Sequence, residues 1–358
     1  METAQRLLQI IKRTIDRPTN FMEVCGTHTM AISSSGIRRA IDKRLKLLSG
    51  PGCPVCVTPD EDIDLAINLA RQPDVIIATF GDMMRVPGSD SSLEREKAKG
   101  CDIRIVYSAL DSLKIAQRER GKKIIFLGVG FETTAPTIAS AIIIAKKEKI
   151  QNFLVLSLFK LIPPALKKIV TAPNLKIDGF ILPGHVSTII GKEPYEFLAK
   201  EFNKPCVITG FETIDILQAI YLLLNQLKTS PKVEIQYRRS VKPEGNRKAQ
   251  ELMNQVFQIT DSNWRGIGRI EGSGLKLKPE YEGFDALKHF NLTHWPRTPD
   301  KRESELRSKC RCGEILLGLC QPPACPLFAK SCTPEHPIGP CMVSSEGACA
   351  AYFKYEPH

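Results

Sequence analysis

The sequence contains no apolar run long enough to cross a lipid bilayer. The longest run, IASAIIIA, spans only residues 138–145, whereas a membrane-spanning helix needs ~20 residues. Residues 1–16 mix charged side chains into an amphipathic helical pattern, which differs from the continuous apolar stretch of a secretory signal. We therefore expect a cytoplasmic protein that has no membrane partner.

The sequence also lacks a concentrated block of basic residues. Lys and Arg number 50 against 39 Asp and Glu, which gives a net charge of +11, but the cations are spread along the chain. Aromatic residues make up 7% of the chain and are not interleaved with the cations, as stacking platforms for bases would be. The positive charge therefore does not predict a nucleic-acid partner.

A complete dinucleotide-binding fingerprint, GxGxxG, is absent as well. The nearest stretch is GVGFET at 128–133, where Thr133 stands in place of the third glycine. In the fingerprint the glycines permit a tight turn, close approach to the pyrophosphate and helix packing. We therefore do not expect a nicotinamide or flavin cofactor.

Cysteine, in contrast, is abundant, with 12 residues in the chain. Thiols stay reduced in the cytosol, so this number favours metal binding or redox catalysis over structural disulfides. Cys25, Cys53 and Cys56 lie early in the chain, and Cys101 and Cys206 are isolated. The others crowd the C-terminal segment and mark it as metal-bearing: Cys310, Cys312, Cys320, Cys325, Cys332, Cys341 and Cys349.

From residue 20 to about 225 the sequence repeats a pattern of strand, polar loop and helix. Short apolar runs rich in β-branched and aromatic residues predict the strands. These runs are 21–24, 45–50, 75–80, 102–107, 123–130, 152–159, 179–184 and 205–210. Helical patterns such as 61–72 and 137–149 separate most of them. This alternation predicts an α/β fold with parallel sheets covered by helices.

An internal repeat favours two sheets over one wide sheet. GFETTAPTIA at 130–139 resembles GFETIDILQA at 210–219, and each follows an apolar strand and opens a helical pattern. We therefore predict two similar parallel-sheet α/β domains, at 20–145 and 146–235, which face each other across a cleft.

The two ends of the chain differ from this pattern. Residues 1–19 predict a helix that packs on the α/β body. Within 236–358, a helical pattern at 246–260 precedes sequence rich in Gly, Pro and Cys. Such a segment cannot bury much apolar surface alone and needs a metal, or docking on the body, to be stable. We predict that 236–358 forms a C-terminal iron–sulfur domain.

Reactive side chains follow the ends of several predicted strands, where ligands of open parallel sheets bind. The segments are CGTHT at 25–29, PGCPVC at 51–56, GDMMRVPG at 81–88, FETT at 131–134, PGHVS at 183–187 and GFET at 210–213. Turn chemistry explains their glycines and prolines but not their reactive residues. We expect Cys25 and His28 to point into the cleft, and His185, Glu132 and Glu212 to line it.

Cys53 and Cys56 are separated by two residues within SGPGCPVCVTPDEDIDL, residues 49–65. Thr58 and Glu61 fit a helix N-terminal capping box, which would place Cys56 just before a helix and favour its thiolate. A lone CxxC is weak evidence for zinc, which needs a second pair of ligands. A buried structural pair at a tight turn is an alternative, but the local pattern favours a redox pair.

Cys25 and His28 form a second candidate site. One cysteine and one histidine cannot close a metal site, so a metal here would need further ligands. Cys53, Cys56, a partner chain or small molecules could supply them. The alternative is a small buried cysteine beside a histidine whose hydrogen bonds are satisfied.

Four C-terminal thiolates could hold a cofactor. The chosen set, by its spacing, is Cys312, Cys325, Cys332 and Cys349. Four thiolates suit a [4Fe–4S] cluster or zinc, and the wide, uneven spacing with prolines beside cysteines favours iron–sulfur. Three surplus cysteines could replace a chosen ligand: Cys310, Cys320 and Cys341.

Taken together and in order, these motifs resemble the HypD family of hydrogenase maturation factors over nearly the whole chain. The matching stretches are CGTHT, SGPGCPVCVTP, GFETTAPT, LPGHVS, CGEILLG at 312–318, and the cysteine-rich segment 325–352. The resemblance implies a cytosolic factor that helps to assemble the Fe(CN)2CO centre of [NiFe] hydrogenases. It also implies a complex with the small chaperone HypC and delivery of cyanide by the HypE–HypF pair.

The resemblance further implies a role for each group of cysteines. Fe(II) carrying CN and CO would be held between Cys25 and the N-terminal cysteine of HypC. Cys53 and Cys56 stay the further candidate ligands named above. A C-terminal [4Fe–4S] cluster would pass electrons to Cys53 and Cys56. A soft thiolate anchors such iron without closing its coordination sphere, and His28 is a candidate proton donor or acceptor beside it.

Two other functions also fit the cysteines. One is an iron–sulfur-dependent disulfide reductase that acts on a protein substrate through Cys53 and Cys56, with Cys25 incidental. The other is a zinc-stabilised binding module without a redox role. About four iron and four acid-labile sulfide per chain would exclude the zinc module.

Overall fold

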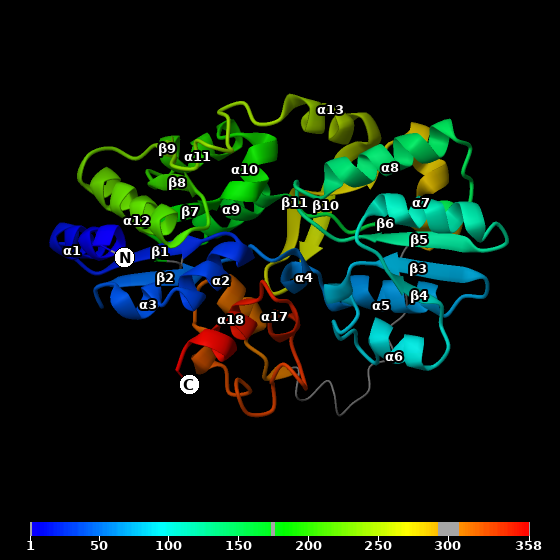
Figure 1. Cartoon of the computed structure of the whole chain (residues 1–358), viewed down its shortest axis with the longest axis horizontal. Helices are drawn as coiled ribbons and strands as arrows, with labels where there is room; N and C mark the ends of the chain where they lie inside the picture. The colour runs from blue at the N-terminus through cyan, green and yellow to red at the C-terminus, as the bar shows by residue number, and fades with distance from the viewer. Residues whose placement is uncertain (1, 173–175, 293–307, 358) are drawn as a thin grey trace.

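The computed structural model describes residues 2–172, 176–292 and 308–357. Two all-parallel sheets lie toward opposite ends of its longest axis (Figure 1). Sheet A has the strand order β2-β1-β7-β8-β9, and sheet B has the order β4-β3-β5-β6. The predicted α/β class with parallel sheets is confirmed.

Sheet A joins strands from two distant parts of the chain. Its strands are β1 (Thr19–Glu23), β2 (Leu45–Ser49), β7 (Gly179–Pro183), β8 (Cys206–Thr209) and β9 (Val233–Ile235). Four helices share one buried apolar cluster with the strands of sheet A: α1 (Glu2–Thr14), α2 (Gly26–Ser34), α3 (Ile37–Ala40) and α12 (Thr213–Lys228). Further helices of this part are α9 (Ile162–Val170), α10 (Gly184–Ile190) and α11 (Glu196–Lys200). The amphipathic pattern at the N-terminus does form a helix, since α1 packs against α12.

Sheet B is built from one continuous stretch of chain. Its strands are β3 (Val75–Thr79), β4 (Ile103–Ile105), β5 (Lys123–Gly128) and β6 (Phe153–Ser157). Its helices are α5 (Asp60–Ala70), α6 (Leu93–Ala98), α7 (Ala109–Arg118) and α8 (Ala135–Lys147). β3 is buried throughout, as expected for an apolar run covered on both faces of a parallel sheet.

The division between the sheets differs from the expected split at residue 145. β1 pairs with β7 through Phe21 and Gly179, so residues 19–49 belong to the same sheet as residues 179–235. Sheet B, at residues 75–157, is therefore inserted between two parts of sheet A. Parallel pairing is set by contacts far apart in the chain, and these leave no local signal in the sequence.

Each copy of the internal repeat lies between a strand of one sheet and the helix that follows it. GFETTAPTIA follows β5 of sheet B and leads into α8, and GFETIDILQA follows β8 of sheet A and leads into α12. The prediction that each copy opens a helix is confirmed. β9, which follows α12, was not predicted because it is short and only partly buried.

After β9 the chain forms a helix and an antiparallel hairpin. α13 (Arg247–Val256) packs against α8, and β10 (Phe257–Trp264) pairs with β11 (Gly268–Leu277), which contacts α9. The helix predicted at 246–260 therefore ends early. These residues dock on the α/β body, one of the two ways in which the sequence indicated that 236–358 could be stable.

The cysteine-rich end packs close to the start of the chain. α14 (Ala286–His289) precedes this end and contacts β6, and the helices of the cysteine-rich end are α16 (Cys312–Leu316), α17 (Pro340–Val343) and α18 (Ala348–Tyr355). α18 packs on α2, and α17 packs on α4 (Pro54–Val57), which carries the CxxC pair. Figure 1 shows these C-terminal helices, in red and orange, below α2 and α4.

Within residues 2–172, 176–292 and 308–357, no helix is both long enough and apolar enough to span a membrane.

Candidate functional site

The CxxC pair lies in the short helix α4. Cys53 and Cys56 are joined by a disulfide, and both are buried. Cys53 is the N-cap residue of α4, and its Sγ accepts a hydrogen bond from the backbone N–H of Cys56 at 3.1 Å. The backbone of the pair therefore favours negative charge on the Cys53 sulfur.

The predicted capping box around Thr58 was wrong. The Thr58 hydroxyl donates backwards to the carbonyl oxygen of Pro54 at 2.8 Å, and so closes the end of α4. The next helix, α5, begins at Asp60 after Pro59, without a side-chain cap. The sulfur placed at a helix N-terminus is consequently that of Cys53, and not that of Cys56 as the sequence suggested.

Cys25 is the N-cap residue of α2 and is buried. Burial and the nearby Glu346 carboxylate raise the pKa of its thiol to about 11, although hydrogen bonds from the backbone of His28 and from Thr27 favour the thiolate. A cation at this position would oppose both unfavourable effects. The thiol is therefore protonated at neutral pH unless a metal or another cation approaches it.

His28 is buried and held in one tautomer. Its Nε2 lies 3.0 Å from the carbonyl oxygen of Gly210 and 3.3 Å from that of Thr209, so Nε2 carries the proton. Its Nδ1 has no hydrogen-bond partner in the described part of the chain. Burial lowers the pKa of His28 to about 4. His28 is thus a neutral imidazole with an unused acceptor nitrogen.

Phe211 packs against two histidines beside this site. Its ring centroid lies 4.7 Å from that of His28 and 4.1 Å from that of His185. Burial lowers the pKa of His185, while Glu346 acts in the opposite direction. His185 therefore lies near both His28 and Glu346.

The two GFET glutamates differ in environment. Glu132 is buried, its Oε1 accepts the backbone N–H of Ile162 at 3.0 Å, and burial raises its pKa to about 7. Its Oε2 has no partner among the described residues. Glu212 instead caps α12 in a reciprocal box with Asp215, and its side chain is 77% exposed. Glu212 therefore stabilises the N-terminal end of α12.

The Cys25 loop touches both other cysteine-bearing segments. The backbone N–H of Gly26 donates to the carbonyl oxygen of Gly52 at 2.9 Å. A Cβ on Gly52 would lie 2.2 Å from the backbone nitrogen of Cys25. On the other side, the Thr27 hydroxyl donates to Glu346 at 2.7 Å. Sequence reasoning missed Glu346, although it lies within the cysteine-rich segment 325–352.

Six C-terminal cysteines line one cavity together with the apolar side chains of Ile315, Phe328 and Met342. The cysteines are Cys310, Cys312, Cys325, Cys332, Cys341 and Cys349. The four chosen from the sequence are all present, and Cys320 does not line the cavity. Of the three surplus cysteines, Cys310 and Cys341 therefore line the cavity, and Cys320 does not.

Cys312 and Cys341 make the closest contact in this cavity, with their sulfur atoms 2.7 Å apart. This hydrogen bond lowers the pKa of Cys312 and raises that of Cys341. Burial and neighbouring thiols raise the pKa of Cys310 to about 12. One cysteine of the predicted ligand set, Cys312, is therefore in contact with Cys341, which lies outside that set.

The cavity adjoins the CxxC pair through α17. The Cys56 sulfur lies 4.0 Å from the carbonyl oxygen of Pro340, the residue before Cys341. A backbone contact of this kind places the two sulfur-rich segments against one another without intervening structure. The three cysteine sites that the sequence predicted separately therefore meet around α4.

The described residues include no group of three or more His, Cys, Asp or Glu side chains arranged to hold a single metal ion. A multi-iron cluster is larger than one ion and holds its thiolates further apart. Six sulfurs around an apolar cavity provide the donor set that [4Fe–4S] clusters use. The residues present therefore fit an iron–sulfur cluster better than a mononuclear zinc site.

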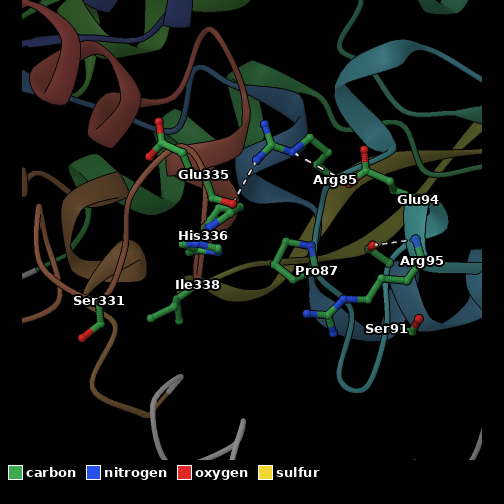
Figure 2. A pocket seen from close by; sticks show the side chains of 11 residues that line it. Arg85, Pro87, Ser91, Glu94, Arg95, Ser331, Glu335, His336 and Ile338 are labelled. Atoms are coloured by element: carbon green, nitrogen blue, oxygen red, sulfur yellow. Dashed lines mark hydrogen bonds and ion pairs between the residues drawn. The ribbon is translucent and has the colours of Figure 1, made fainter. Parts of the chain in front are cut away.

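A second cavity, of about 360 Å³, lies between the segment 85–95 and the segment 331–338 (Figure 2). The Arg85 guanidinium donates to the carbonyl oxygen of Pro334 and lies 3.9 Å from Glu94. Arg85 and Arg95 line this cavity together with Glu94 and Glu335, so their charges offset one another. The Arg85 hydrogen bond links the segment before α6 to the loop that follows Cys332.

Comparisons with known proteins give the same family over nearly the whole chain. The family model HypD, described as hydrogenase formation hypA family, matches residues 2–356. The chain is 46% identical to hydrogenase maturation factor HypD2 of Bradyrhizobium diazoefficiens, over 99% of this chain and 94% of that protein. It is 45% identical to hydrogenase maturation factor HypD of Escherichia coli, over 96% and 90% respectively. It is 42% identical to hydrogenase expression/formation protein HupD of Azotobacter chroococcum, over 99% and 94%.

Proposed function

Because the chain belongs to the HypD family of hydrogenase maturation factors, we propose that it is a scaffold and redox factor for assembly of the Fe(CN)2CO centre of [NiFe] hydrogenases. The observation that carries this proposal is the meeting of three cysteine sites. The Cys25 loop, the Cys53–Cys56 pair and the C-terminal cysteine cavity are joined by direct contacts around α4.

In this proposal iron is the cargo, and Cys25 is its anchor on this chain. The backbone N–H groups at the start of α2 favour the Cys25 thiolate, and bound iron would supply the positive charge that burial otherwise opposes. A single thiolate leaves coordination positions open for CN and CO. A HypC-type partner would contribute the second thiolate.

His28 would act as a proton acceptor near the iron. The imidazole is neutral, its Nε2–H is held by backbone carbonyls, and Nδ1 is unused within the described structure. The hydrogen bonds at Nε2 fix the ring, so Nδ1 has a constant direction. Metal ligation by His28 is the less favoured role.

The Cys53–Cys56 pair would store two electrons. Its reduction consumes two electrons and two protons and converts the disulfide into two thiols. The hydrogen bond from the Cys56 N–H favours negative charge on Cys53 when the pair is reduced. In this proposal Cys53 therefore carries the reactive thiolate, and neither cysteine is required as an iron ligand.

A [4Fe–4S] cluster would be held by four of the six cavity cysteines. When bound, such a cluster supplies electrons one at a time. The set predicted from the sequence is Cys312, Cys325, Cys332 and Cys349. The Cys312–Cys341 contact favours Cys310 as the first ligand in place of Cys312. Iron and sulfide content of Cys310→Ala and Cys312→Ala would separate the two sets.

In this proposal the assembly of the iron centre takes place in the cytoplasm, where thiols stay reduced. The partners would be a HypC-type chaperone and a HypE-type protein that, with HypF, donates cyanide. The even spread of Lys and Arg gives no reason to add nucleic acid to this list.

Infrared spectroscopy of the anaerobically purified complex tests the proposal, because terminal CN and CO stretches have no other origin in such a protein. The wild-type chain with its HypC-type partner should show these bands. Cys25→Ala should abolish them while keeping the visible absorption of the cluster. Cys101→Ala is the matched control and should leave both signals unchanged. Bands that persist in Cys25→Ala would refute Cys25 as the anchor.

The disulfide of Cys53 and Cys56 also favours a second candidate, a reductase of protein disulfides. Their burial, 2% and 0% exposed, argues against access by a protein substrate. Cys56→Ser would trap a mixed disulfide with such a substrate through Cys53. A trapped partner other than the maturation proteins would support the reductase, and the absence of any adduct would count against it.

A further inference from the structure

The tip of the β10–β11 hairpin is wedged between the CxxC helix and the cysteine cavity. On one side, the backbone N–H of Arg265 donates to the carbonyl oxygen of Val57, at the end of α4, at 2.8 Å. On the other side, a Cβ on Gly266 would lie 2.1 Å from the Cα of Gly313, which follows Cys312. Gly266 also has a φ of +73°, a conformation that favours glycine. The hairpin tip therefore touches both sulfur-bearing segments.

The Arg265 side chain binds the end of α4 tightly. Its Nε and Nη2 donate to the carbonyl oxygen of Thr58 at 3.0 and 2.6 Å, and its Nη1 pairs with Asp60. The side chain is only 15% exposed. The planar guanidinium makes these contacts in one fixed geometry, which a lysine cannot reproduce.

The same guanidinium faces the thiols. Arg265 and Asp60 line a cavity of about 360 Å³ together with Cys310, Cys312 and Pro340. The positive charge of Arg265 is therefore buried between the end of α4 and the cysteines of this cavity.

Other cations near the site are engaged elsewhere. Arg311 also lines the cavity but pairs with Glu314 and is more exposed. The buried Arg38 pairs with Glu23, and the buried Lys160 pairs with Asp62. Arg265 is consequently the buried cation, within the described residues, that binds the end of α4 and lines the thiol cavity.

We propose that Arg265 is a positioning residue for the redox pair: it fixes the Cys53–Cys56 helix against the cysteine cavity and holds a buried positive charge at the end of that helix. This inference rests on the proposed function, since it concerns the same disulfide. Reduction adds two electrons and two protons to the disulfide, and any thiolate character of the products is stabilised by a neighbouring cation. Loss of the cation should therefore make the disulfide harder to reduce.

The test is a redox titration of the full chain in dithiothreitol buffers at pH 7, with Cys53 and Cys56 quantified by alkylation and mass spectrometry. Arg265→Gln removes the charge and should lower the equilibrium constant for reduction about tenfold, which is about 30 mV for a two-electron couple. Arg265→Lys keeps the charge and should stay within about threefold of wild type. Arg269→Gln, an exposed change on the same hairpin, is the control and should have no effect.

Asp60→Asn provides a test of opposite sign. It removes the carboxylate that offsets Arg265, so the disulfide should become easier to reduce. This variant and Arg265→Lys also decide the matter should Arg265→Gln fail to fold. If the wild-type pair titrates normally but the equilibrium constant is unchanged in Arg265→Gln or Asp60→Asn, the inference about Arg265 is overturned and the proposed function is not. A wild-type pair that does not titrate as a couple would refute the proposed function itself.

Discussion

At the scale of single residues, two of the residues predicted from the sequence carry a polar atom that is buried and, within the described structure, without a hydrogen-bond partner. These atoms are His28 Nδ1 and Glu132 Oε2. Buried polar groups normally have a hydrogen-bond partner, so those without one are candidates for function. The residue types were predictable from the motifs, but their protonation was not, because burial and hydrogen bonds set it.

The two cysteines of the CxxC pair should differ in reactivity once reduced. Cys53 receives the N–H of Cys56, and a hydrogen bond to a charged sulfur is worth about 1.5 kcal/mol, or about tenfold in an equilibrium. Cys53 in the Cys56→Ser variant should therefore be alkylated by iodoacetamide about tenfold faster at pH 7 than Cys56 in Cys53→Ser. Site-resolved mass spectrometry measures both rates. Equal rates, or a faster Cys56, would contradict the assignment.

His28 and Glu132 should give the folded protein opposite pH dependences. The pKa of Glu132 is raised to about 7 from 4.5, so the folded state keeps a proton that the unfolded chain has lost, and stability falls as pH rises across this window. The pKa of His28 is lowered to about 4 from 6.5, so stability rises with pH across that window. Each effect is of order 3 kcal/mol, and the two largely cancel where the windows overlap.

Single variants should separate these two dependences. Glu132→Gln should leave the contribution of His28, so that stability rises between about pH 4.5 and 6.5. His28→Gln should leave the contribution of Glu132, so that stability falls between about pH 4.5 and 7. Urea unfolding at several pH values measures both slopes, and the double variant serves as the control with a nearly flat profile. Flat profiles in both single variants would show that neither group is as desolvated as the structure indicates.

At the scale of elements, the sequence predicted what depends on local pattern. All eight apolar runs became strands of the two parallel sheets, although β4 is short and partly exposed. The short, partly buried β9 and the polar β10 carry no such pattern, and both were missed. The capping box failed for a related reason: Thr58 fits two helix ends equally well, and the choice depends on whether Pro54–Val57 forms a helix.

The contact between the Cys25 loop and the CxxC loop depends on Gly52. A Cβ at this position would lie 2.2 Å from the backbone nitrogen of Cys25 and 2.4 Å from its Cα, so one of the loops must move. Overpacking of this kind costs about 1–3 kcal/mol. Gly52→Ala should lower the free energy of unfolding by this amount in urea titrations. It should also weaken iron retention by the complex.

Gly121→Ala is the matched control, because a Cβ on Gly121 meets no atom within 4 Å. This variant should unfold within about 0.5 kcal/mol of wild type. A Gly52→Ala protein that matched it in both stability and iron retention would show that the two loops need not touch.

At the scale of the whole molecule, the chain order of the sheets could not be foreseen. The sequence repeat indicated two α/β units, but the pairing of Phe21 with Gly179 joins segments far apart in the chain. This pairing brings the Cys25 loop and the PGHVS loop to neighbouring strands of one sheet. It also leaves α2 and α4 available to contact the cysteine-rich end, so that the three cysteine sites meet.

The cysteine-rich end should depend on its cofactor more than the sheets do. Its helices α16, α17 and α18 have 5, 4 and 8 residues, which is too short for stability without packing or a metal. Protein purified anaerobically should contain about four iron and four sulfide. Removal of this iron with a chelator under reducing conditions should speed hydrogen exchange in residues 308–357, while β3, β5, β7 and β8 keep their protection because apolar burial holds them.

Exchange that rises equally throughout would mean that cofactor and sheets form one cooperative unit. Exchange unchanged by the chelator would mean that docking on α2 and α4 alone stabilises this end.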